Sequence, residues 1–160
     1  MAGYREQYDR MKRWYARFEA IDKGRQHDVA SDNYVDEIYA FFLNCYHLKD
    51  WIKHDPAVLP IFVSDKAAAA AVEGAIKADR SLKLCADICN SLKHLRLTRP
   101  EKSGESPTFG AKHFALSLGS GPPTISLKYE VDTASGPEDA FQIAVECVKA
   151  WDRFLGTHGL

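Results

Sequence analysis

Apolar residues recur along this chain with two different spacings. From residue 4 to residue 97 they return every three or four positions, the period that places side chains on one face of an α-helix. Between residues 109 and 132 the period shortens to two, as in strands, and it lengthens again from 137 onward. The pattern predicts helices at 4–22, 32–54, 65–97 and 137–155, with a β-hairpin within 109–132.

Residues at the ends of these segments support the predicted bounds. Ser31 and Asp32 suit the N-cap of the second helix, and Pro56 disfavours helix in the residue before it. Gly74 is a possible break within the third helix, so two shorter helices in its place remain open. The segment 135–138 reads as a capping box for the last helix, with Pro137 in its first turn.

The fold class predicted from these elements is mainly α: a four-helix bundle with a β-hairpin inserted before its last helix. The 160 residues suit one domain spanning 1–160. Hydrophobic residues make up 46% of the chain and charged residues 27%, which is the ordinary range for a globular protein and argues against wholesale disorder.

Cellular location is predicted from the apolar segments and the cysteines. No stretch approaches the roughly 20 apolar residues that cross a bilayer, and the first residues are charged rather than signal-like. We therefore expect a cytoplasmic protein without membrane contact. The four cysteines, Cys45, Cys85, Cys89 and Cys147, sit within apolar helical patterns, so in a reducing compartment they are most simply core residues.

The third predicted helix is the segment richest in candidate chemistry. Its polar face, opposite the cysteines, consists of Arg80, Lys83, Asp87, Asn90, Ser91 and His94. A basic cluster follows at its C-terminal end: Lys93, Arg96, Arg99 and Lys102. These cations either stabilise the end of the helix through its dipole or bind RNA phosphates. The net charge of −1 argues against a protein coated with nucleic acid but leaves room for such a local patch.

The segment Cys89-Asn90-Ser91-Leu92-Lys93-His94 resembles the Arg-Asn-x-x-x-His signature of HEPN domains. The second-helix segment from Phe41 to Trp51 and the order of the helices also look like those of bacterial HEPN-like proteins. The resemblance covers about residues 4 to 97 and the last helix, but not the hairpin. It implies an all-α bundle, often dimeric, of the kind found in toxin–antitoxin, CRISPR and antiphage (antiviral defence) systems, many of whose members are metal-independent endoribonucleases.

The resemblance also implies roles for two residues. His94 would act as general acid or base toward the 2′-hydroxyl and the scissile phosphate, and Asn90 would orient it. The arginine of the signature falls on Cys89, which cannot supply a fixed positive charge for the phosphate. We therefore expect a HEPN-like homodimer of RNA-directed or defence-related biology, with the third helix near its axis and with catalysis disfavoured by Cys89.

Two alternatives from other classes remain open. One is a non-catalytic dimeric interaction module that binds a partner protein. The other is a metal-dependent hydrolase, because His47, Asp50 and His54 lie at i, i+3 and i+7 on one face of the second helix and could share a divalent ion. Apart from that hypothetical ion, no cofactor is predicted, since the chain has no glycine-rich phosphate loop, dinucleotide fingerprint or nucleophile elbow.

Overall fold

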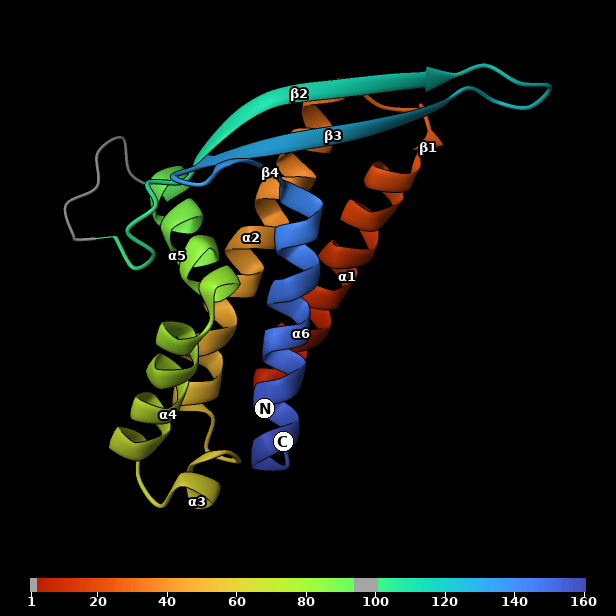
Figure 1. Cartoon of the computed structure of the whole chain (residues 1–160). Helices are drawn as coiled ribbons and strands as arrows, with labels where there is room; N and C mark the ends of the chain where they lie inside the picture. The colour runs from red at the N-terminus through yellow and green to blue at the C-terminus, as the bar shows by residue number, and fades with distance from the viewer. Residues whose placement is uncertain (1–2, 94–100) are drawn as a thin grey trace.

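The computed structural model describes residues 3–93 and 101–160. In this part of the chain the helices stand side by side as a bundle, and the strands form one sheet across one end of it (Figure 1). The helices are α1 (Tyr4–Lys23), α2 (Ser31–His54), α3 (Leu59–Phe62), α4 (Asp65–Ala78), α5 (Arg80–Lys93) and α6 (Ala140–His158). The strands are β1 (Arg25–Gln26), β2 (Thr108–Ser117), β3 (Thr124–Thr133) and β4 (Gly136–Asp139).

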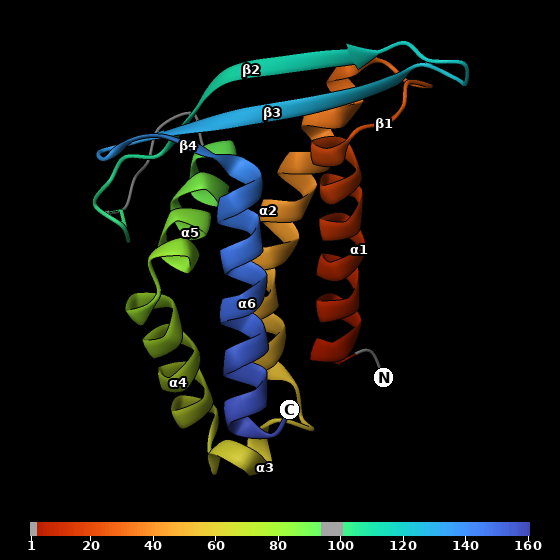
Figure 2. The same ribbon diagram turned by 45° about the vertical axis from the view of Figure 1, so that its right-hand side comes forward.

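The bundle has four columns: α1, α2, α6, and a fourth made of α4 followed by α5 (Figure 2). Helix α2 places an apolar side chain in the core at nearly every turn, and α1, α5 and α6 supply the residues that pack against it. Trp151, Tyr34 and Phe18 are the bulkiest side chains that are almost fully buried. Burying a large apolar side chain in this way stabilises the folded state by about 1.5–3 kcal/mol relative to leaving it exposed to water.

The third predicted helix is in fact two helices that meet at Asp79. The extended backbone of Asp79 (φ −111°, ψ 121°) ends α4. Its carboxylate then accepts the N–H of Leu82 in the first turn of α5, at 3.0 Å. Asp79 thus caps α5, because its side chain satisfies an N–H group that has no partner within the helix. Gly74, the possible break in the predicted helix 65–97, lies inside α4.

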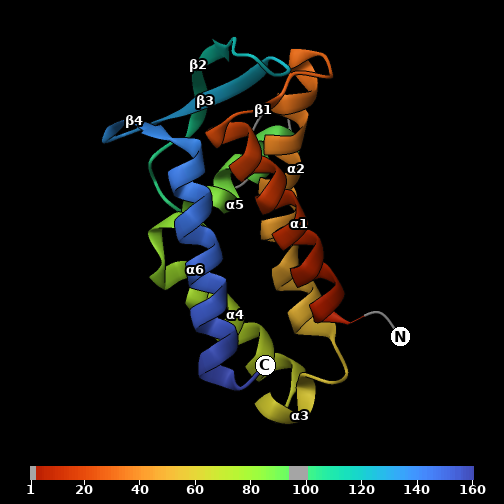
Figure 3. The ribbon, with the colours of Figure 1, turned by 90° about the vertical axis from the view of Figure 1, so that its right-hand side faces the viewer.

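The sheet is antiparallel, with β3 at its centre. On one side β3 pairs with β2, and on the other side with β1 and β4. Leu127, Tyr129 and Val131 of β3 are buried and face the bundle, which fixes the register of the strand. In the side view the sheet caps one end of the bundle, and α3 lies at the other (Figure 3).

The pairing of β2 with β3 contains a bulge, because two residues of β2, Gly110 and Ala111, lie opposite one residue of β3. A Cβ at Gly110 would lie 2.6 Å from the carboxylate of the exposed Asp132 side chain, which would have to move to make room for it. After the bulge, Lys112, Phe114 and Leu116 lie on the same face as the buried residues of β3.

The predicted fold class is wrong. The described residues form six helices and a four-stranded antiparallel sheet, a small mixed α/β fold rather than a plain four-helix bundle with one hairpin. The two added strands, β1 and β4, have little strand propensity of their own. They are strands because they pair with β3, whose backbone groups would otherwise be unpaired along that edge.

The predicted start of the last helix is also wrong. Pro137 lies in β4, opposite Asp132, and not in a helical turn. Helix α6 begins at Ala140, and its N-cap is Asp139, whose carboxylate accepts the N–H of Phe141 at 2.9 Å. Pairing with β3 and the Asp139 cap therefore override the capping-box signal at 135–138.

No helix among the described residues is both long enough and apolar enough to cross a membrane.

Candidate functional site

The polar face of α5 serves largely to hold other parts of the chain. Asp87 is buried, and its carboxylate accepts hydrogen bonds from the backbone N–H groups of Lys102 and Ser103, both at 2.7 Å. Arg80 forms ion pairs with Glu105 of the same loop and with Glu138 of β4. These two carboxylates raise the Arg80 pKa, and the guanidinium keeps their pKa values below the usual range. Much of the predicted polar face of α5 is therefore occupied by contacts within the chain.

The HEPN-like signature can be located only in part. Asn90 is half-buried, and Lys93 is exposed at the last residue of α5. Cys89, at the position of the signature arginine, is 2% exposed, and burial raises the pKa of its thiol to about 11. It is therefore a neutral core residue at physiological pH. His94, Arg96 and Arg99 lie outside the described residues.

Lys102, the last member of the predicted basic cluster, has partners of its own. Its Nζ lies 3.1 Å from the carboxylate of Glu73 on α4, and its backbone N–H is bound by Asp87. Glu73 also pairs with Lys53 of α2. The charge of Lys102 is therefore largely matched within the molecule, and of the located members of the cluster Lys93 is the more exposed.

The predicted metal ligands on α2 do not converge. His47, Asp50 and His54 are exposed, and Asp50 lies near the ammonium groups of Lys49 and Lys53, at 3.1 and 3.9 Å. Among the described residues, one group of three candidate ligands has all its donor atoms within 4.8 Å of one another, and it is a different one.

That group consists of three cysteines, Cys45 of α2, Cys85 of α5 and Cys147 of α6. All three are buried, as the sequence pattern predicted, and none forms a disulfide. Cys85 and Cys147 donate their thiol hydrogens to the carbonyls of Phe42 and Ser81, at 3.5 and 3.2 Å. The sequence shows no sign of this convergence, because the three residues are tens of positions apart and only the packing of the helices brings them together.

A tryptophan adjoins the three thiols, one turn after Cys147 on α6. The Nε1 of Trp151 is buried and has no hydrogen-bond partner at normal distance among the described residues. It nevertheless lies near enough to Cys45 to affect its titration. Burial alone would raise the pKa of Cys45, but the neighbouring thiols of Cys147 and Cys85 and the Trp151 indole lower it. Side-chain interactions with its neighbours and burial raise the pKa of Cys85.

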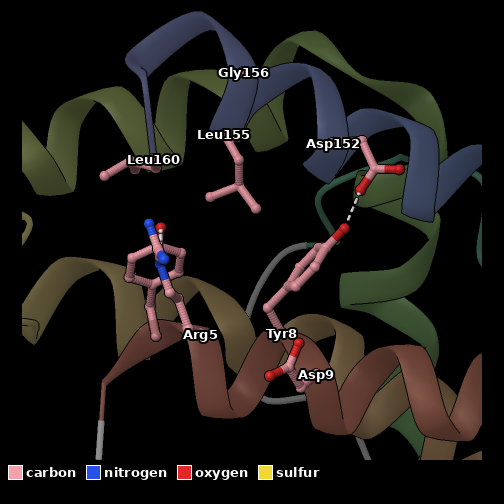
Figure 4. Close-up of a pocket in the computed structure, with 8 residues that line it drawn as sticks. Arg5, Tyr8, Asp9, Asp152, Leu155, Gly156 and Leu160 are labelled. Atoms are coloured by element: carbon pink, nitrogen blue, oxygen red, sulfur yellow. Dashed lines mark hydrogen bonds between the residues drawn. The ribbon is translucent and has the colours of Figure 1, made fainter.

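A groove of about 610 Å³ lies between the start of α1 and the end of α6 (Figure 4). Tyr8 donates its hydroxyl hydrogen to Asp152 across it, at 2.7 Å. Burial and this hydrogen bond raise the pKa of Tyr8 to about 12. Arg5 and Asp9 add charges of opposite sign to its lining, and the Tyr8 hydroxyl is committed to Asp152. The groove thus offers no matched acid–base pair with a free proton.

Three of the five exposed large apolar residues among the described residues lie on the hairpin, and the other two, Ile61 and Val63, lie at α3. Phe114, Leu116 and Leu118 are 44%, 57% and 77% exposed, so exposure rises toward the hairpin tip. Figure 1 shows the hairpin extending past the end of α1. Strand β2 is an edge strand, since β3 is its one partner in the described sheet. Exposed apolar residues on a strand with an unpaired edge are typical of a protein-binding surface.

The comparisons with known proteins give no relative from which to transfer a function. No family model, no curated protein and no solved structure matches this chain.

Proposed function

We propose that this protein is an interaction module that binds a partner protein through the free edge of β2. The observation that carries the proposal is the pair of exposed residues Phe114 and Leu116 on an edge strand, a row that Leu118 continues just past the end of β2. A partner segment in extended conformation would add a strand beside β2, and its side chains would cover this row.

The strand also indicates the chemistry of the partner segment. Strand β2 contains Lys112 and His113 and no acidic residue. His113 is paired with Glu130 of β3, whereas Lys112 lies over the ring of Tyr129 with its ammonium group 5.4 Å from the ring centre. Since Lys112, Phe114 and Leu116 share one face of β2, a segment with apolar residues opposite Phe114 and Leu116 and an acidic residue opposite Lys112 complements this edge in shape and in charge.

The ribonuclease hypothesis has weaker support. Charge stabilisation at the scissile phosphate needs a cation, and the position of the signature arginine holds a buried, neutral cysteine. The proposal therefore favours the interaction module over the HEPN-type nuclease.

Synthetic ten-residue peptides test the proposal. One has valine at two successive alternate positions and glutamate at the next alternate position, with threonine elsewhere. A second has lysine in place of the glutamate, and a third is the first peptide with N-methylated backbone amides. Fluorescence anisotropy should show binding of the first peptide at micromolar concentration, with the other two at least about 10-fold weaker, a difference of about 1.4 kcal/mol.

Two variants make the test specific to β2. Leu116→Glu should abolish binding of the acidic peptide, and Ile61→Glu should leave it unchanged, because Ile61 is 45% exposed but lies on α3 at the other end of the bundle. Equal binding of all three peptides, or an unchanged affinity in Leu116→Glu, would refute the proposal.

Sedimentation showing a dimer that Leu116→Glu dissociates would mean that the partner is a second copy of this chain. Tight RNA binding that Leu116→Glu leaves intact would favour the nuclease hypothesis.

A further inference from the structure

The spacing of three buried sulfur atoms suits a metal ion. A metal with three thiolate ligands at about 2.3 Å in a trigonal plane holds its sulfur atoms about 4 Å apart. The Sγ atoms of Cys45, Cys85 and Cys147 all lie within 4.8 Å of one another. Each sulfur comes from a different helix, so the three can surround one point in the core.

An unpartnered polar group lies beside this cluster. Trp151 is 1% exposed and lies one turn after Cys147 on α6, and its indole N–H has no hydrogen-bond acceptor at normal distance among the described residues. An unsatisfied buried donor of this kind costs about 1–3 kcal/mol. A thiolate sulfur is a stronger acceptor than a thiol, so the indole would gain a charge-assisted hydrogen bond if Cys45 were a thiolate ligand.

The donor atoms select the class of ion. The cluster offers sulfur alone, which suits soft ions and not the hard cations that take oxygen ligands. Zinc is almost always four-coordinate in structural sites, and the described residues place three such donors here. A monovalent ion stable with three sulfur ligands fits this number better.

We infer that Cys45, Cys85 and Cys147 bind one Cu(I) ion in a three-coordinate site that Trp151 supports through a hydrogen bond to Cys45. Binding replaces the thiol hydrogens by the metal and releases up to three protons to solvent, with no change in oxidation state. The ion would tie α2, α5 and α6 together in the core. The inference does not depend on the β2 edge, so either proposal can fail without the other.

The test uses the full chain, reduced and kept free of oxygen. Cu(I) from a buffered complex is added to the folded protein and, in parallel, during refolding, because the site is enclosed. One equivalent should bind, with a thiolate-to-copper absorption band in the ultraviolet and an increase in the thermal unfolding temperature. Zn(II), and Co(II) as its coloured substitute, are titrated separately. X-ray absorption of the copper-loaded protein should show three sulfur neighbours at about 2.3 Å.

Variants of the chain's own cysteines supply the controls. Cys45→Ala should lose the band, and Cys89→Ala should keep it, since Cys89 is equally buried but lies outside the cluster. Trp151→Phe should weaken binding about 10-fold while keeping the band. The proposal is overturned if neither route loads copper, if Cys45→Ala binds as tightly as the wild type, or if the ion has nitrogen or oxygen neighbours. Should Cys45→Ala not fold, the sulfur count from the loaded wild type decides alone. Tighter binding of Zn(II) than of Cu(I) would also overturn the assignment.

Discussion

The side chain of Asp87 holds Ser103 by two hydrogen bonds to the same oxygen. Oδ2 of Asp87 accepts the backbone N–H of Ser103 at 2.7 Å and its hydroxyl hydrogen at 2.6 Å. Oδ1 accepts the N–H of Lys102 at 2.7 Å. A single buried carboxylate on α5 therefore anchors the loop that leads into β2, and it sets where the hairpin begins.

Replacing this carboxylate should destabilise the protein strongly. Asp87→Ala removes the acceptor of three hydrogen bonds and leaves their donors partly buried, so we expect the free energy of unfolding to fall by about 3 kcal/mol. Urea denaturation followed by circular dichroism measures the change. Ser103→Ala is the control, because it removes one donor and should cost about 1 kcal/mol. Equal losses in the two variants would contradict this role of Asp87.

Two glycines, Gly3 at the start of α1 and Gly74 in α4, should change stability in opposite directions when replaced by alanine. Asp55 accepts the N–H of Tyr4 at 2.7 Å, and a Cβ at Gly3 would lie 2.6 Å from the same carboxylate oxygen. Gly3→Ala should therefore lower stability by about 1–2 kcal/mol, through loss of this cap. Gly74→Ala meets nothing within 4 Å in the middle of α4 and should raise stability by about 0.5–1 kcal/mol. Thermal unfolding of both variants measures the difference, and a neutral Gly3→Ala would show that Asp55 moves aside freely.

The Glu73 carboxylate predicts how stability depends on pH. Burial alone would raise the Glu73 pKa, but Lys53 and Lys102 lower it to about 2, against about 4.5 in the unfolded chain. A carboxylate with a lowered pKa stabilises the folded state fully above its unfolded pKa, and this contribution is lost as the pH falls from about 5 to about 2.

Glu73→Gln should remove this part of the acid sensitivity. At neutral pH we expect the variant to be less stable by about 1–2 kcal/mol after solvent screening, and the difference from wild type should vanish near pH 2. The control is Glu146→Gln, which removes an exposed carboxylate paired with Lys149. Denaturation curves between pH 2 and 7 check both variants, and a constant difference across that range would contradict the assignment.

The sequence predicted the helices well where one apolar face decides them. The first and second helices were placed at 4–22 and 32–54, and the structure has them at Tyr4–Lys23 and Ser31–His54. The helix break was misplaced because a capping aspartate, Asp79, outweighs a glycine: Gly74 lowers helix propensity, whereas the Asp79 carboxylate satisfies the N–H of Leu82. Strand β1 was missed because its pairing with β3 joins residues far apart in the sequence, which no local pattern encodes. Strand β4 was missed because it has little strand propensity of its own, although it forms a tight hairpin with the end of β3.

The candidate site was less predictable than the fold, for a physical reason. Helical spacing shows which residues share a face, but not what packs against that face. Asp87 therefore looked like part of an exposed polar site and is a buried anchor for residues 102–103. The cysteines looked like separate core residues, yet three of them converge. The dimer with the third helix near its axis stays a prediction, although α5 is largely buried by its own chain.

The four cysteines should report on opening of the bundle. All four are at most 2% exposed, and Cys89 has a pKa of about 11, so at pH 8 it is almost entirely a thiol and a poor nucleophile. In the metal-free protein, a thiol reagent at pH 8 should therefore react at least about 1,000-fold more slowly than with the unfolded chain, because the helices must open first. Four thiols should react in denaturant and three in Cys89→Ala, which assigns one quarter of the amplitude to Cys89. If the slow rate in the folded protein equals that of global unfolding for every thiol, the core opens as one unit. A single thiol that reacts within seconds would contradict the enclosed core, and the variant would show whether it is Cys89 or a member of the three-cysteine cluster.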